Sequence, residues 1–212
     1  NCADFSIDQA YRTLGVAIKL RRAAKEGVDG GEVPFLYAHP NERMKVIHEK
    51  VGHHSIGHMK RYAALLRFDR LVQERIKVKP MADAVSALTS PVLKWAIPQP
   101  KKNDNGIKAK LEEDSAFGEE FSELFDEVRE IYPVTGYREA KYLNWRYKNN
   151  PLQKFETLKL YERKRLCGYC IFERRRDTIH IVDMIVTEID KLAEPLLAEL
   201  FGNLRRTKCA SV

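Results

Sequence analysis

The chain has 212 residues, of which 44% are hydrophobic and 32% are charged, and its formal net charge is +7. This length can bury one large core or two small ones. Since no run approaches 18 uncharged apolar residues, we expect no membrane span. The basic charge suits an anionic ligand, but the 37 basic residues are interleaved with 30 acidic ones, and this pattern favours solvated turns over a nucleic-acid surface.

The first part of the chain predicts an α/β unit. Apolar residues recur at helical spacing from Val16 to Gly27, before a glycine-rich stop at Gly30 and Gly31. Asn41 is a suitable N-cap for a second helix, which would end at Gly52. Short apolar runs predict strands at residues 2–7, 35–38 and 56–66.

Residues 12–17 lie between the first predicted strand and the first helix, and they have the layout of a phosphate-binding loop. Gly15 can adopt a positive φ and lets the backbone approach a ligand, while the free N–H groups of the helix start would point at an anion. Arg12 would add a fixed positive charge. A glycine before a helix also occurs in ordinary turns, so the local pattern leaves both interpretations open.

The second part predicts a meander of strands between two amphipathic helices. A helix around residues 81–95 and a linker rich in proline and polar residues come first. An acidic amphipathic helix follows at residues 119–131, and a last helix carries Pro195 in its predicted first turn. The strands are expected at residues 155–161, 166–172 and 178–186, and residues 209–212 begin another.

Cys167 and Cys170 have the spacing of a metal or redox pair. On a regular strand, residues three apart point to opposite faces, so we expect the two thiols to diverge. No second pair of Cys or His lies nearby in the sequence to complete four ligands. We therefore expect buried free thiols in a cytoplasmic protein.

The longer run at residues 7–17 resembles the signature of the GNAT superfamily of N-acetyltransferases, in which Arg or Gln, two residues, Gly, one residue and Gly or Ala bind the pyrophosphate of acetyl-CoA. Residues 40–52 resemble the segment, running from an Asn to a Gly, that ends the acetyl-CoA region in that superfamily. Residues 35–54 are similar to a branch associated with polysaccharide biosynthesis. The resemblance implies acetyl-CoA as co-substrate, no metal, and a small-molecule amine acceptor such as an amino sugar. It places cofactor contacts at Phe5, Ile7, Arg12, Thr13, Leu14, Gly15, Val16, Ala17 and Asn41.

The resemblance also suggests residues for proton transfer. The position at which GNAT enzymes often carry an acidic tyrosine is His48 here, and an imidazole with a pKa of about 6.5 can donate or accept a proton. The alternative is a surface histidine partway along a helix. Asp4 and Asp8, on or beside the cofactor strand, are the candidates for a general base, unless they are simply solvated.

The order of elements in the second half, a meander followed by a helix and a strand, is also the order of a GNAT core. We therefore predict an α/β (α+β) chain of two partial GNAT-like domains, each a mixed, mainly antiparallel sheet flanked by helices, in a fragment cut at both ends. The boundaries would be 1–72 for the domain with the acetyl-CoA loop, 73–117 for a helical and Pro-rich linker, and 118–212 for the degenerate domain. Glu188 and Asp190 would repel phosphates at the corresponding place in the second domain.

Two other functions fit the sequence. One is a GNAT-fold binding module without catalysis, and the other is a Fem-like amide-forming transferase that uses aminoacyl-tRNA. Residues 142–147 are aromatic and basic and could stack on bases, but they resemble a block of the tandem GNAT branch. We expect them to pack against the sheet, with Arg146 neutralising a carboxylate, or to contact the acceptor. His53, His54 and His58 would place at most two side chains on one face of a strand, too few for a closed metal site.

Overall fold

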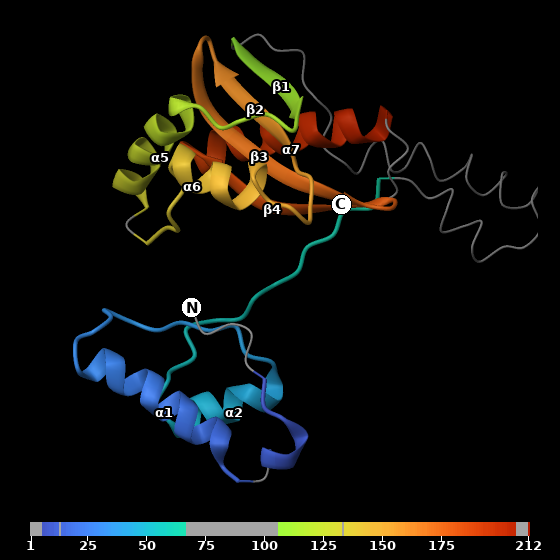
Figure 1. Cartoon of the computed structure of the whole chain (residues 1–212). Coiled ribbons are helices and arrows are strands. Elements are labelled where there is room, and N and C mark those ends of the chain that lie inside the picture. The colour runs from blue at the N-terminus through green and yellow to red at the C-terminus, as the bar shows by residue number, and fades with distance from the viewer. Residues whose placement is uncertain (1–5, 13, 67–105, 133, 207–211) are drawn as a thin grey trace, which may run out of the picture. The chain divides into compact units, whose positions relative to one another are not determined.

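The structure is a computed structural model, and it describes residues 6–12, 14–66, 106–132, 134–206 and 212 (Figure 1). Contacts divide the chain into two compact units, Asn1–Tyr62 and Ala63–Val212. The predicted helix at residues 81–95 lies outside the described residues. Among the helices that are described, none is long and apolar enough to cross a membrane.

The regular secondary structure described in the first unit is helical. It contains a short 3-10 helix, η1 (Gln9–Tyr11), and two α-helices, α1 (Val16–Asp29) and α2 (Glu42–Lys50). The predicted ends are confirmed: Gly30 caps α1, and the Asn41 side chain accepts a hydrogen bond from the backbone N–H of Met44 at 3.0 Å.

Among the described residues, the strands predicted at 2–7, 35–38 and 56–66 are not found. Residues 6–7 and 35–38 have no regular secondary structure, and residues 56–66 contain only an isolated bridge at Leu65. The prediction of a sheet in each half is therefore wrong for the described residues. A strand is stabilised by its pairing with a neighbouring strand, and short apolar runs do not by themselves supply that partner.

The second unit contains one antiparallel sheet of four strands, in the order β1-β2-β3-β4 (Figure 1). Its strands are β1 (Ile107–Glu113), β2 (Glu156–Glu162), β3 (Arg165–Arg175) and β4 (Thr178–Val186). The three strands predicted for the second half are thus confirmed. β1 is a correction, because it lies within residues 73–117, for which the sequence predicted a linker.

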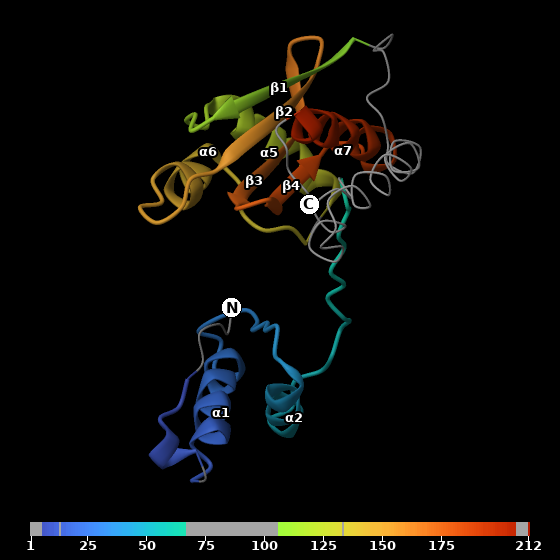
Figure 2. The ribbon, with the colours of Figure 1, turned by 90° about the vertical axis from the view of Figure 1, so that its right-hand side faces the viewer.

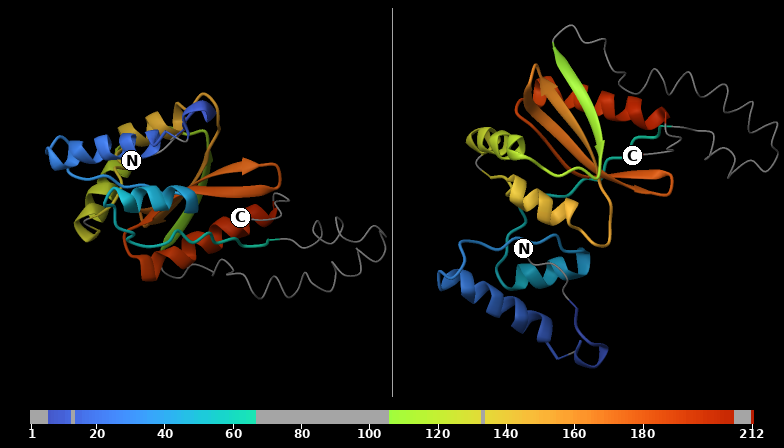
Figure 3. Two further views of the ribbon diagram at one scale, coloured as in Figure 1. Left: turned by 90° about the horizontal axis from the view of Figure 1, so that it is seen from below. Right: turned by 45° about the horizontal axis from the view of Figure 1, so that its top comes forward.

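Helices cover both faces of this sheet (Figures 2 and 3). α5 (Glu119–Ile131), α6 (Ala140–Leu143) and the π-helical turn η2 (Asn144–Lys148) pack on one face, where Phe121, Leu143 and Tyr169 are buried together. α7 (Ile189–Arg206) packs on the other face through residues such as Leu196 and Leu200. Pro195 lies inside α7 rather than in its first turn, because the helix already begins at Ile189.

Two bulges interrupt the ladders and correct the prediction for the thiols. Leu160 pairs with Gly168 and Tyr161 with Leu166, so Cys167 is an extra residue in β3. This insertion shifts the alternation of side chains, and both Cys167 and Cys170 join the core on the α7 face. The thiols are buried and free, as expected, but they do not point to opposite faces. The second irregularity lies between Ile171 and Phe172, where β4 carries Val182 as its extra residue.

Val212 pairs with Ala64 within the second unit. Each residue donates its backbone N–H to the carbonyl of the other, at 2.9 Å in both directions. Next to this pair, Leu66 is buried in the core on the α7 face. Residues 207–211, which include most of the last predicted strand, lie outside the described residues.

Candidate functional site

The loop at residues 12–17 ends in a left-handed glycine. Gly15 has φ 70° and ψ 13° and is the N-cap of α1, a helix of 14 residues. A Cβ atom on Gly15 would meet no atom within 4 Å. Glycine has no side chain to cap the helix, and the first turn of α1 contains no acidic residue. Among the described residues, no side chain caps the backbone N–H groups at the start of α1, such as that of Ala17, and N–H groups of this kind can bind an anion.

The residues before Gly15 form a compact turn. The Nε of Arg12 donates a hydrogen bond to the carbonyl of Ile7 at 3.1 Å, and the Arg12 side chain is exposed. Asp8 caps η1, since its Oδ1 accepts a hydrogen bond from the N–H of Ala10 at 2.9 Å. Leu14 is also exposed. The predicted residues Asp4, Phe5 and Thr13 lie outside the described residues.

His48 is buried between the two helices and is not a surface residue, with only 5% of its area exposed. Its ring meets that of His53 edge-on, with 4.9 Å between the centroids. Burial lowers the pKa of His48, and the neighbouring charges of Arg21 and His53 lower it further. At neutral pH the imidazole is therefore uncharged, which makes it a proton acceptor rather than a donor. Among the described residues no hydrogen bond or ion pair joins His48 to the loop at residues 12–17, and Asn41 bonds to the start of α2.

The junction between β4 and α7 is a poorer site for an anion than the loop at residues 12–17. The N–H of Thr187 donates to the carbonyl of Cys167 at 3.0 Å, and the carbonyl of Glu188 accepts the N–H of Leu192 at 2.9 Å. The Glu188 carboxylate lies 3.3 Å from the Nζ of Lys191, which also pairs with Glu162. With Asp190 in the first turn of α7, the local charge opposes a phosphate.

Sequence reasoning missed an ion pair on the α5 face of the sheet. The Nε of Arg138 lies 2.9 and 3.0 Å from the two carboxylate oxygens of Asp183, and the Tyr169 hydroxyl donates to the same carboxylate at 3.3 Å. Burial raises the pKa of Tyr169, and the Asp183 charge raises it further, so its hydroxyl keeps its proton. The available signal was Asp183 itself, a single charge between the apolar residues Val182 and Met184 of β4.

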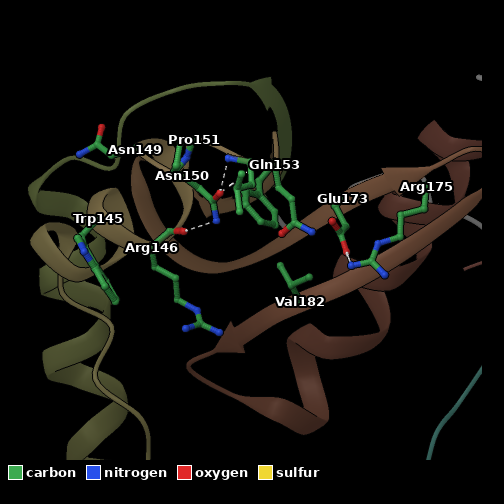
Figure 4. A pocket seen from close by; sticks show the side chains of 11 residues that line it. Trp145, Arg146, Asn149, Asn150, Pro151, Gln153, Glu173, Arg175 and Val182 are labelled. Carbon is green, nitrogen blue, oxygen red and sulfur yellow. Dashed lines mark hydrogen bonds and ion pairs between the residues drawn. The ribbon is translucent and has the colours of Figure 1, made fainter. Parts of the chain in front are cut away.

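A surface hollow of about 530 Å³ lies where η2 and the turn after it face the end of β3 and the middle of β4 (Figure 4). Trp145, Phe155 and Val182 supply apolar walls, and Arg146 supplies a positive charge. The sequence had suggested that Arg146 neutralises a carboxylate, but among the described residues it forms no ion pair. Its Nε instead donates to the Tyr147 hydroxyl at 3.3 Å.

Comparisons with known proteins add little to this geometry. No protein-family model matches the sequence, and no curated protein matches it. One solved structure with some similarity is a functionally unknown conserved protein from Staphylococcus epidermidis, with 14% sequence identity and a TM-score of 0.36. The match covers 53% of this chain and 42% of that chain, so it spans less than half of the other protein's length.

Proposed function

We propose that the chain binds acetyl-CoA through the loop at residues 12–17 and that the complete protein transfers the acetyl group to an amine. The observation that carries this proposal is the left-handed Gly15 at the uncapped start of α1. A pyrophosphate could accept hydrogen bonds from the first N–H groups of the helix, where the helix dipole also favours negative charge. The open space beside Gly15 leaves room for the phosphates.

Arg12 supports the same ligand. Its Nε bond to Ile7 fixes the guanidinium beside the loop, and the two terminal nitrogens can donate to phosphate oxygens. The resemblance to the GNAT signature at residues 7–17 favours a CoA pyrophosphate over other anions. The junction before α7 would not take this role, because Glu188 and Asp190 lie there.

In acetyl transfer, the amine nitrogen attacks the thioester carbonyl, the C–S bond breaks, and the amine proton passes to a base while the thiolate leaves. His48 is uncharged at neutral pH and can accept a proton, but it is buried. Asp8 is held by its cap bond to Ala10. These two observations favour a second candidate function, a binding module that holds acetyl-CoA without transferring its acetyl group.

Calorimetric titration of acetyl-CoA into the chain and into a Gly15→Glu variant tests the binding site. The new carboxylate would stand among the phosphates, so we expect affinity to fall by at least about tenfold. Gly31→Glu is the matched control: Gly31 has φ 78°, it also has nothing within 4 Å of its Cβ position, and it follows the other end of α1. Equal affinity in the parent and Gly15→Glu, or an equal loss in Gly31→Glu, would contradict the proposal.

Thiol release from acetyl-CoA in the presence of an amine panel then separates the two candidate functions. An N-acetyltransferase releases CoA in proportion to the acetylated amine. A binding module shows the calorimetric signal but no release above the rate without protein.

A further inference from the structure

The hollow beside η2 contains a positive charge without a carboxylate partner. Among the described residues, no carboxylate lies within ion-pair distance of Arg146, whose Nε is hydrogen-bonded to the Tyr147 hydroxyl. The other cation of the hollow, Arg175, is neutralised by Glu173, with 2.6 Å between their charged atoms. Arg146 therefore provides one positive charge in the hollow that a ligand could neutralise.

An exposed aromatic ring lies next to this charge. Trp145 is 66% exposed although it is a large apolar side chain. Figure 4 shows Trp145 and Arg146 extending from η2 toward the same side of the hollow, with Val182 opposite them on β4. A flat ring could cover the indole while a charged group on that ring meets the guanidinium.

The segment that carries both side chains is firmly held. The Asn144 amide donates to the carbonyls of Phe117 and Ala140, both at 2.8 Å, and its oxygen accepts the N–H of Phe117 at 3.0 Å. The Asn150 oxygen accepts the N–H of Leu152 at 2.9 Å and so fixes the turn that forms the rim. η2 itself is closed by an i to i+5 bond from Asn149 to Asn144 at 2.8 Å, and such π-helical turns are frequent at functional sites. A site held in this way needs little reordering when it binds.

We propose that this hollow binds a small molecule in which a carboxylate is attached to a six-membered ring. The carboxylate would accept hydrogen bonds from the terminal nitrogens of Arg146, and the ring would stack on Trp145. The volume of about 530 Å³ is within the usual range for small-molecule sites, roughly 300–1,000 Å³, and exceeds what one ring needs. The proposal stands on the second unit alone and does not depend on acetyl-CoA binding by the first.

The carboxylate-bearing ring could be aromatic or a sugar acid, and two pairs of probes distinguish these sources. Benzoate is compared with benzamide, and glucuronate with glucose, so that each pair differs in charge but little in shape. The readout is the indole N–H resonance of Trp145 in the NMR spectrum of the full chain. The chain has two tryptophans, and a Trp145→Phe variant identifies which resonance belongs to Trp145.

We expect benzoate or glucuronate to shift the Trp145 resonance in titrations up to roughly 10 mM, because a single charged contact supports millimolar affinity. The uncharged partner of the pair should bind at least about tenfold more weakly. Arg146→Gln should weaken the binding of the charged probe to the same extent. Arg165→Gln is the control, since Arg165 is at the opposite end of β3 and pairs with Glu127.

Three results would overturn the proposal: no shift with either acid, equal affinity for an acid and its uncharged partner, or equal weakening by Arg146→Gln and Arg165→Gln. Dispersed amide resonances show whether each variant is folded. If Arg146→Gln fails to fold, Arg146→Lys replaces it. That variant keeps the charge but loses the paired donors, and unchanged affinity would then also count against the proposal.

Discussion

Replacing Gly168 with alanine is expected to strain the pairing of β3 with β4. A Cβ atom at this position would lie 2.6 Å from Cγ1 of Val186 and 3.0 Å from the carbonyl oxygen of Ile185. Carbon atoms in contact are normally about 3.5–4.0 Å apart, so the overlap with Val186 is about 1 Å. One of the two obstructing atoms belongs to the backbone, and a rotamer change of Val186 cannot remove that contact.

Overpacking of this kind costs about 1–3 kcal/mol, and the backbone contact places Gly168→Ala near the upper end of the range. The assay is urea denaturation followed by far-UV circular dichroism. With a denaturant slope of about 1–3 kcal/mol/M, a loss of about 3 kcal/mol lowers the midpoint by at least about 1 M. A loss below about 0.5 kcal/mol would show that β3 and β4 are not paired as described.

Two further variants make this test specific. Gly118→Ser adds a side chain where nothing lies within 4 Å, at the N-cap of α5, so its stability should equal or exceed that of the parent. Val186→Ala removes one of the two obstructing groups. In a double-mutant cycle, Gly168→Ala and Val186→Ala together should cost less than the sum of the single variants, by about 1 kcal/mol.

Two other predictions concern the charges around Lys159, whose Nζ lies 2.8 Å from a Glu112 oxygen and 3.0 Å from a Glu120 oxygen. Lys159→Met should lower the free energy of unfolding by about 2 kcal/mol in the same assay, since two partly buried carboxylates lose their partner; Glu112→Gln in that background should restore part of the loss. Burial alone would raise the pKa of Glu112, but hydrogen bonds from Lys110, Lys159 and Ser115 lower it to about 2. The pKa of Glu112 is lower in the folded than in the unfolded chain, so the ionised carboxylate stabilises the fold fully above pH 4.5, and this stabilisation is lost as the pH falls toward about 2. The urea midpoint should therefore decline more steeply between these pH values in the parent than in Glu112→Gln.

The sequence predicted the second half well because local signals and tertiary pairing agree there. The strands alternate or are continuously apolar, and Arg163 and Arg176, which have φ 59° and 57°, lie in the turns between them. α5 was predicted with its observed bounds. β1 was missed although Ile107, Ala109 and Leu111 alternate with polar residues, since the nearby prolines favoured a linker.

The first half and the thiols show what a local pattern cannot specify. Residues 35–38 are apolar, but no partner strand is described beside them, and they remain irregular. Cys167 and Cys170 lie on the same face of the sheet because one residue is inserted in β3. The regular alternation of side chains along a strand does not predict such an insertion. For the candidate site, the left-handed Gly15 and the cap at Asn41 followed from residue type, whereas the burial of His48 depends on contacts between two helices.

Asn144 limits how this protein can vary in evolution. Its amide uses both donors and its acceptor at once, on the two backbone groups of Phe117 and on Ala140. Aspartate lacks the donors, serine and threonine are too short to reach both sides, and glutamine has an additional methylene group. Homologous chains that keep this arrangement should therefore vary less at Asn144 than at the neighbouring Trp145, whose exposed side chain makes none of these bonds.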